Sequence, residues 1–162
     1  MTMRPAPDPL PVIDSLDELA DLVVRQPDVY LRYSEGPETD SHETASCDYE
    51  ADVLMPGLSV SAIAPEPWWP RPAQDWIARR IRQYAQLHEP GRFPWVLTGR
   101  VVGHGPDHEP LVTDIRPIAA LGERTLAEAA TRYRERFEVG RDSRTGQRPD
   151  TSALPLGQRG GA

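Results

Sequence analysis

A short segment of the chain gathers side chains that can bind a metal ion or transfer protons. Four of them lie within one turn's length: His104, Asp107, His108 and Glu109. Imidazole and carboxylate groups are ligands of zinc and iron. Gly105 and Pro106 disfavour the helix that would put both histidines on one face, and the other histidines, His42 and His88, have no recognisable spacing. We therefore interpret the segment as a solvated turn and predict no metal site.

Trp68 and Trp69 are the most unusual local feature, because four prolines surround them in PEPWWPRP. Adjacent aromatic side chains near prolines can form a wall on which a ligand stacks, or the centre of a protein-binding surface. The alternative is structural: one indole packs against Trp76 and the other covers the edge of the core. The sequence leaves both interpretations open.

Other catalytic signatures are missing. The single cysteine, Cys47, has Asp48 and Glu50 beside it, and these carboxylates disfavour a reactive thiolate. We find no Ser-His-Asp set, no phosphate-binding glycine loop and no dinucleotide-binding fingerprint.

The periodicity of apolar residues predicts one α+β domain, with a small, mostly antiparallel sheet packed against about three helices. Ser15 and Glu18 form a capping box that begins the first helix, and Pro27 ends it. The further expected elements are strands over 29–33 and 58–63, a helix over 72–88, a hairpin of strands 95–102 and 109–115, and a helix over 123–137. Residues 34–49 are expected to form a loop.

Three stretches, Leu16–Ser34, Met55–Tyr84 and Trp95–Val112, resemble a family of small actinobacterial proteins that is known only as a domain of unknown function. The resemblance is strongest in PGLSV, WWPRPAQDW and VLTGRVVGHGPDHEPLV. It implies no activity.

A second resemblance is to the ADP-ribosyltransferase fold. Members of that family begin with a helix and a strand bearing Arg or His, continue to a strand with a Gly-Leu start, and later place a Glu at the head of a strand. YLRY with Arg32, GLSVS with Ser59 and EPLV with Glu109 follow this order, which looks like the Arg, Ser, Glu subclass. The chain departs from the family pattern: no Gly follows Arg32, no Ser-Thr-Ser triplet is present, and Asp107 stands where Glu or Gln is usual.

This resemblance implies NAD as the substrate and no metal. Glu109 would stabilise the ribosyl cation that develops when nicotinamide leaves, with Ser59 holding Glu109 in place. Arg32 would bind the pyrophosphate, and Tyr33 or Trp69 would stack on nicotinamide. Each residue also has a plain interpretation: Arg32 as a charge on a strand surface, Ser59 as the solvent side of an alternating strand, and Glu109 as the end of a polar hairpin.

Composition limits the partners and the location. The net charge of −7 and the pI near 5.1 argue against broad binding to nucleic acids or anionic membranes. One cysteine, no leader-like start and no long apolar run predict a cytoplasmic protein. The Pro-rich residues 1–11 and the Gly- and Arg-rich residues 139–162 are expected to be disordered, which leaves 12–138 as the folded domain.

Two classes of function remain. In the first, the chain is an NAD-handling enzyme, a transferase or glycohydrolase whose ligand is a nucleotide. In the second, it is a non-catalytic interaction or regulatory module that binds a protein partner through the Trp-Pro surface. Arg32 and Glu109 together in one site would favour the first class, and an exposed patch of Trp68 and Trp69 would favour the second.

Overall fold

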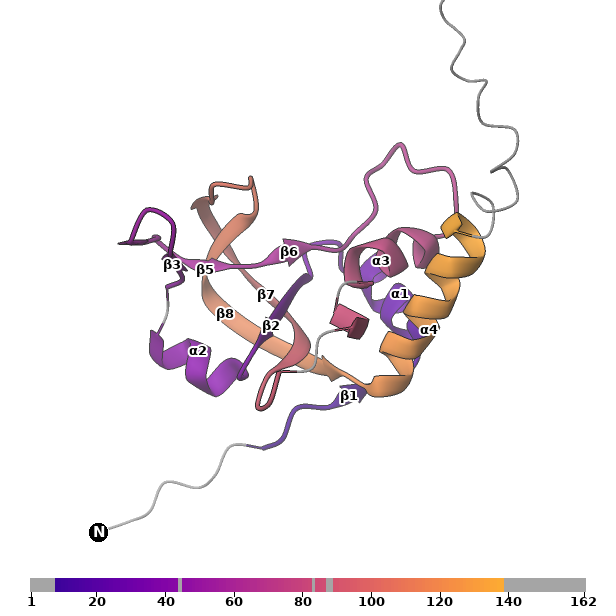
Figure 1. Cartoon of the computed structure of the whole chain (residues 1–162), viewed down its shortest axis with the longest axis horizontal. Coiled ribbons are helices and arrows are strands. Elements are labelled where there is room, and N and C mark those ends of the chain that lie inside the picture. Colours follow the sequence, from indigo (N-terminus) through magenta and orange to yellow (C-terminus); the bar gives the residue numbers. More distant parts are fainter. Residues whose placement is uncertain (1–7, 44, 83, 87–88, 139–162) are drawn as a thin grey trace, which may run out of the picture.

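The computed structural model describes residues 8–43, 45–82, 84–86 and 89–138. The predicted α+β class is confirmed: α1, α3 and α4 gather at one end of a curled sheet, and α2 lies toward the other end (Figure 1). The helices are α1 (Leu16–Arg25), α2 (Pro37–Glu43), α3 (Ala73–Ile81) and α4 (Glu123–Tyr133), with a 3₁₀ turn over Tyr84–Gln86 and a π turn over Arg134–Glu138. The strands are β1 (Val12–Ile13), β2 (Tyr30–Ser34), β3 (Cys47–Asp48), β4 (Val53–Leu54), β5 (Leu58–Ser59), β6 (Ser61–Ala62), β7 (Phe93–His104) and β8 (Pro110–Leu121).

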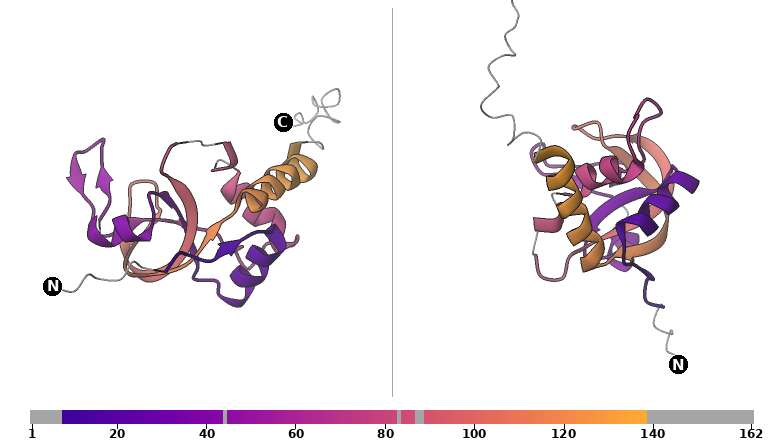
Figure 2. Two further views of the ribbon diagram at one scale, coloured as in Figure 1. Left: turned by 90° about the horizontal axis from the view of Figure 1, so that it is seen from below. Right: turned by 90° about the vertical axis from the view of Figure 1, so that its right-hand side faces the viewer.

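The sheet is mixed and closes on itself. Its order is β1-β8-β7-β2-β6, and β5 pairs with β8. Since Val60 alone separates β5 from β6, this short segment bonds to β8 on one side and to β2 on the other. The pairs are antiparallel except for β1, which runs parallel to β8. The long hairpin of β7 and β8 therefore curls round the shorter strands, as Figure 2 shows.

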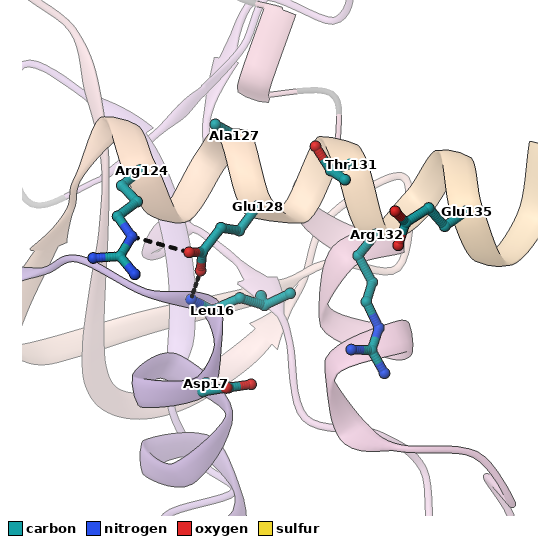
Figure 3. A pocket seen from close by; sticks show the side chains of 8 residues that line it. All are labelled: Leu16, Asp17, Arg124, Ala127, Glu128, Thr131, Arg132 and Glu135. Atoms are coloured by element: carbon teal, nitrogen blue, oxygen red, sulfur yellow. Dashed lines mark hydrogen bonds and ion pairs between the residues drawn. The ribbon is translucent and has the colours of Figure 1, made fainter.

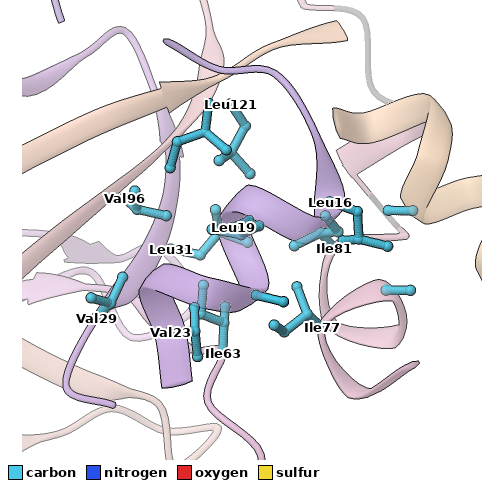
Figure 4. Packing of buried hydrophobic residues seen from close by; sticks show 14 of the residues in the cluster. Leu16, Leu19, Val23, Val29, Leu31, Ile63, Ile77, Ile81, Val96 and Leu121 are labelled. Atoms are coloured by element: carbon cyan, nitrogen blue, oxygen red, sulfur yellow. The ribbon is translucent and has the colours of Figure 1, made fainter. Parts of the chain in front are cut away.

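Two hydrophobic clusters follow from the alternation of side chains along the strands. Val96 and Leu31 face the helices and pack with residues of α1 and α3, as Figure 4 shows. The neighbouring Trp95 and Leu97 face the opposite side and pack with Leu58, Val60 and Val112 inside the curl. A strand exposes successive side chains on opposite faces, so one hairpin supplies both clusters.

At the start of α1 the Ser15 half of the predicted capping box is formed, and the Glu18 carboxylate accepts from the residue before the N-cap. The backbone N–H of Glu18 donates to the Ser15 hydroxyl at 3.0 Å, and the Asp14 N–H donates to the Glu18 carboxylate at 3.3 Å. Leu16, Leu19, Ala20 and Val23 form the buried side of the helix.

Three predictions about the elements need correction. The helix expected over 72–88 ends at Ile81, and a separate 3₁₀ turn follows over Tyr84–Gln86. The expected loop over 34–49 contains α2 and β3, and the expected single strand over 58–63 is divided into β5 and β6. Within the arm that is expected to be disordered, Leu10 packs against the cluster inside the curl and the Pro11 carbonyl accepts from Ala120. The rest of that arm, residues 1–7, and the tail 139–162 lie outside the described residues.

Candidate functional site

Arg32, Ser59 and Glu109 lie together although they come from separate segments of the chain. Arg32 on β2 donates from Nη1 to the backbone carbonyl of Ser59 at 2.8 Å. The hydroxyl of Ser59 on β5 donates to Oε2 of Glu109 at 3.1 Å. Ser59 is therefore the link between the cation and the carboxylate, as the sequence analysis expected of its hydroxyl.

The other side of the Arg32 guanidinium is bound to a residue that the sequence did not suggest. Asp40 on α2 accepts from Arg32 Nε at 2.5 Å and from Nη2 at 3.2 Å. Asp40 also accepts from the Ser34 hydroxyl at 2.7 Å, and Ser34 in turn accepts from the indole N–H of Trp95 at 3.0 Å. A continuous series of hydrogen bonds thus leads from the buried Trp95 to Glu109.

The guanidinium has a structural role in this arrangement. The three hydrogen bonds that Arg32 donates use three of the five N–H groups of a guanidinium. Its side chain is 16% exposed and that of Asp40 is 3% exposed, so the pair is largely removed from water. Arg32 fixes α2 and β5 in place, and only its remaining N–H groups can meet a ligand.

The hairpin turn holds the Glu109 carboxylate. Oε1 of Glu109 accepts from the backbone N–H of Asp107 at 3.0 Å. The Gly105 N–H donates to the Glu109 carbonyl at 2.8 Å, and a Cβ at Gly105 would overlap the carboxylate. His108 has a φ of 65°, the left-handed conformation that glycine adopts more easily than other residues. The turn thus presents a half-buried carboxylate with both oxygens engaged.

Tyr33 and Trp69 are not brought to this cluster. Tyr33 lies beside Tyr84, with 5.6 Å between ring centroids, and Tyr84 packs against the helix-side core. Adjacent strand residues face opposite ways, so Tyr33 lies across the sheet from Arg32. Trp69 packs against Trp76 of α3 at 5.1 Å, and its indole N–H donates to the Pro72 carbonyl. The structure therefore gives neither ring a place next to Glu109.

The tryptophan that the sequence analysis overlooked is the most buried. Trp95 is fully buried, whereas Trp68 is 69% exposed and Trp76 is half-buried. Trp68 and Trp69 both make edge-to-face contacts with Trp76. The indole N–H of Trp76 is buried and has no acceptor among the described residues. The geometry therefore supports packing against Trp76 as the role of Trp69. Trp68 remains open to solvent.

A second charged cluster joins α3 to α4. The carboxylate of Asp75 is buried and accepts from Arg71 at 3.0 Å and from Arg132 at 2.6 Å, with Arg136 at 3.8 Å. Three cations around one carboxylate leave a surplus of positive charge at this end of the molecule.

An open groove of about 370 Å³ runs between α1 and α4 (Figure 3). In it, Glu128 accepts from the backbone N–H of Leu16 at 2.8 Å and from Arg124 at 3.0 Å. The bond from Leu16 is the main reason that the pKa of Glu128 lies below its ordinary value, and the Arg124 cation acts in the same direction. Its lining mixes acidic and basic side chains, and it contains none of the predicted site residues.

The hairpin histidines do not form a metal site with their neighbours. Within the described ranges, no group of three or more His, Cys, Asp or Glu side chains is arranged to hold a metal ion. Cys47 is a half-buried free thiol in β3. Among the helices of the described residues, none is long and apolar enough to cross a membrane.

Comparison with known proteins gives one match. The model of a family of unknown function matches residues 6–146. No curated protein and no solved structure matches the chain. The resemblance to ADP-ribosyltransferases thus receives no support from the comparisons and stays a prediction.

Proposed function

The chain belongs to this family of unknown function (DUF6098), and we propose that it handles NAD in the manner of an ADP-ribosyltransferase, as a transferase or a glycohydrolase. The observation that supports the proposal is the hydrogen-bonded line from Arg32 through Ser59 to Glu109. The order of these residues along the chain suggested it, and the fold brings them together.

The chemistry assigned to Glu109 is electrostatic. When the bond between ribose C1′ and nicotinamide breaks, its electron pair moves to the ring nitrogen, and positive charge develops on the ribose. A carboxylate fixed beforehand stabilises that charge without having to reorganise. Water then bonds to C1′ and loses a proton to solvent, or an acceptor nucleophile takes the place of water. The bonds from Ser59 and Asp107 fix the carboxylate in this way.

The structure changes the assignment of Arg32. The guanidinium of Arg32 is bound to Asp40 and to the Ser59 carbonyl, so its main role is to hold these residues of the site in place. At most two of its N–H groups are left to bind a phosphate. An Arg32→Ala variant would leave Asp40 buried without its cation, so it cannot separate binding from folding. Glu109 is the better residue to test.

The decisive variant is Glu109→Gln, which keeps the shape of the side chain and removes its charge. We expect nicotinamide release from NAD to fall by about 10²-fold or more, the usual loss when one electrostatic stabiliser is removed. Nicotinamide and ADP-ribose are measured by chromatography, and binding is measured as the rise in melting temperature with NAD.

The matched control is Glu66→Gln, at an exposed glutamate for which the structure shows no side-chain hydrogen bond. It should retain the activity of the unmodified chain. If that unmodified chain releases no nicotinamide and NAD does not raise its melting temperature, the proposal is wrong.

A second candidate function is a protein-interaction module, and the 69% exposure of Trp68 favours it. A large exposed indole beside arginines is typical of the centre of a binding surface. We expect a partner protein to be captured by the unmodified chain and lost with Trp68→Ser. Capture that does not depend on Trp68 would contradict this role.

A further inference from the structure

The loop before α3 and the two helices α3 and α4 form a surface of aromatic rings and arginines. We call it the Trp-Arg surface and define it by Trp68, Trp69, Trp76, Arg71, Arg79, Arg80 and Phe137. Arg80 lies over the Trp76 ring at 5.8 Å, and Arg71 lies 4.7 Å from the Phe137 centroid. Trp68 is the most exposed of the tryptophans that define it.

Two segments at this end of the molecule, 71–82 and 132–136, carry a net positive charge although the whole chain carries −7. Residues 71–82 and 132–136 contain seven arginines and two acidic residues, Asp75 and Glu135, which gives 7 − 2 = +5. The carboxylate of Asp75 is buried beneath Arg71 and Arg132, so it neutralises charge without presenting an anion to a partner.

The opposite charge is concentrated in another part of the chain. Residues 33–64 contain seven acidic residues and no arginine or lysine. They include the small hairpin 47–54, which we call the acidic hairpin, with Asp48, Glu50 and Asp52. The same hairpin exposes apolar side chains: Tyr49 is 88% exposed and Leu54 is 75% exposed.

The two surfaces lie at opposite ends of the molecule. In Figure 1, β3 lies at one end of the long axis and α3 with α4 at the other, and the left view of Figure 2 shows the same separation. The acidic hairpin therefore cannot contact the Trp-Arg surface of its own chain. The charge and the apolar side chains of the acidic hairpin suit a contact with the Trp-Arg surface of a second chain.

We infer that the chain associates head to tail, with the acidic hairpin of one copy bound to the Trp-Arg surface of the next. Opposite charge steers and orients the encounter, and Tyr49 and Leu54 pack against the exposed indole of Trp68. A contact between two different surfaces leaves one of each free at the ends, so it propagates into longer oligomers or closes into a ring. The inference gives a partner to the second candidate function and is independent of NAD handling.

The acidic hairpin matches this surface better than nucleic acid does. Phosphates would meet the same arginines, but a polyanion is charged along its whole length, so the net charge of −7 repels every part of it beyond the contact. Nucleic acid also has no aliphatic side chain to cover Trp68, whereas the acidic hairpin supplies Leu54 beside its carboxylates.

The test uses two double variants, each of which disrupts one of the two binding surfaces. Tyr49→Ser/Glu50→Arg alters the acidic hairpin, and Trp68→Ser/Arg80→Glu alters the Trp-Arg surface. All four residues are exposed, so melting temperatures should stay close to that of the unmodified chain. The control Val24→Ser/Arg25→Glu makes the same kinds of change at exposed positions of α1, outside both surfaces.

Sedimentation equilibrium on the full-length chain measures the mass over about 10 µM to 1 mM, a range suited to small, transient interfaces. The unmodified chain and the control should gain mass with concentration, and salt should reduce the gain. Each end variant should remain a monomer. An equimolar mixture of the two variants should form a dimer and nothing larger, because only one intact pair of surfaces is present.

A monomeric unmodified chain would overturn the inference, and so would a dimer that either variant forms alone, since that contact would pair identical surfaces. A monomeric chain that still captures a different protein through Trp68 would overturn self-association and retain the interaction module. A chain that neither self-associates nor captures another protein would contradict both the self-association and the interaction module.

Discussion

At the scale of single residues, the Arg32–Asp40 pair has the clearest consequence for stability. Both side chains are largely buried, and Asp40 also accepts from Ser34. Transferring two charges from water is costly, and only their mutual attraction and the additional hydrogen bonds offset that cost. Losing one partner leaves the other without compensation.

We therefore expect Asp40→Asn to reduce the free energy of unfolding by about 3 kcal/mol, within the range for breaking a buried pair. The matched control is Asp114→Asn, which removes the partner of Arg100 in a pair that is 68% and 73% exposed. Exposed pairs contribute about 0–1 kcal/mol, so the control should change little. Urea unfolding of both variants measures the difference, and equal losses would contradict the structural role of Asp40.

Trp95 supplies a second prediction at this scale. Among the four tryptophans, Trp95 is the fully buried one. Trp95→Ala should cost about 3–5 kcal/mol, the usual loss for a large aromatic core residue. Trp68→Ala should cost well under that, because 69% of its surface is already exposed. Urea unfolding measures these losses, and a larger loss for Trp76→Ala than for Trp95→Ala would contradict the prediction.

Sequence could suggest Arg32, Ser59 and Glu109 because their order along the expected strands resembles the ADP-ribosyltransferase pattern. It could not suggest Asp40, whose segment is polar and lacks periodicity. The only signals were Pro37, which suits a first helical turn, and an arginine in a half-buried strand that needed a carboxylate partner. The stacking role expected of Tyr33 needs it on the same face of the sheet as Arg32, and strand alternation puts the two side chains on opposite faces.

At the scale of elements, the junction of α1 and α4 depends on one carboxylate. Glu128 of α4 accepts the backbone N–H of Leu16 in the first turn of α1, so one side chain fastens two helices. This bond keeps the pKa of Glu128 below its ordinary value. A depressed pKa in the folded state means that the group stabilises the fold above its unfolded pKa and loses that contribution as pH falls through the folded pKa.

Glu128→Gln should accordingly destabilise the protein at about pH 7, where the carboxylate is charged in both states. The difference in the free energy of unfolding between this variant and the unmodified chain should shrink as pH falls below about 4.3, the ordinary pKa of Glu. It should vanish below the pKa of Glu128 in the folded state. Urea unfolding across this pH series measures the effect. A difference that is constant with pH would show that the lost contribution is not the charge.

Most elements could be predicted because their apolar residues repeat at helical or strand spacing, as in Leu16, Leu19 and Val23 of α1. The division of 58–63 into β5 and β6 could not, because alternation specifies which side chains are buried and not which strand is the neighbour. Leu58 pairs with Val112 on β8, while Ser61 pairs with Leu31 on β2. That change of partner is a property of the closed sheet.

At the scale of the whole molecule, the closed sheet explains how a small chain buries two clusters. One lies between the sheet and α1, α3 and α4, and the other lies inside the curl. β1 completes the sheet by pairing with the end of β8, and the residue before it takes part, since the Pro11 carbonyl accepts from Ala120 at 2.8 Å. The N-terminal boundary of the fold therefore depends on how much the contacts of Leu10 and Pro11 stabilise it.

Two truncated chains, 8–140 and 12–140, test that boundary. The longer should melt close to the full chain, because the composition of residues 1–7 and of the tail predicts no contribution to the core.

The shorter loses the Pro11–Ala120 bond and the packing of Leu10 against the cluster inside the curl. A hydrogen bond and a partly buried leucine together contribute about 2 kcal/mol, which corresponds to a fall of about 5–10 °C in Tm for a domain of this size. Differential scanning calorimetry compares the two. Equal Tm values would restore the boundary at Val12 that composition suggested, and a lower Tm for 8–140 than for the full chain would show that the terminal segments support the fold.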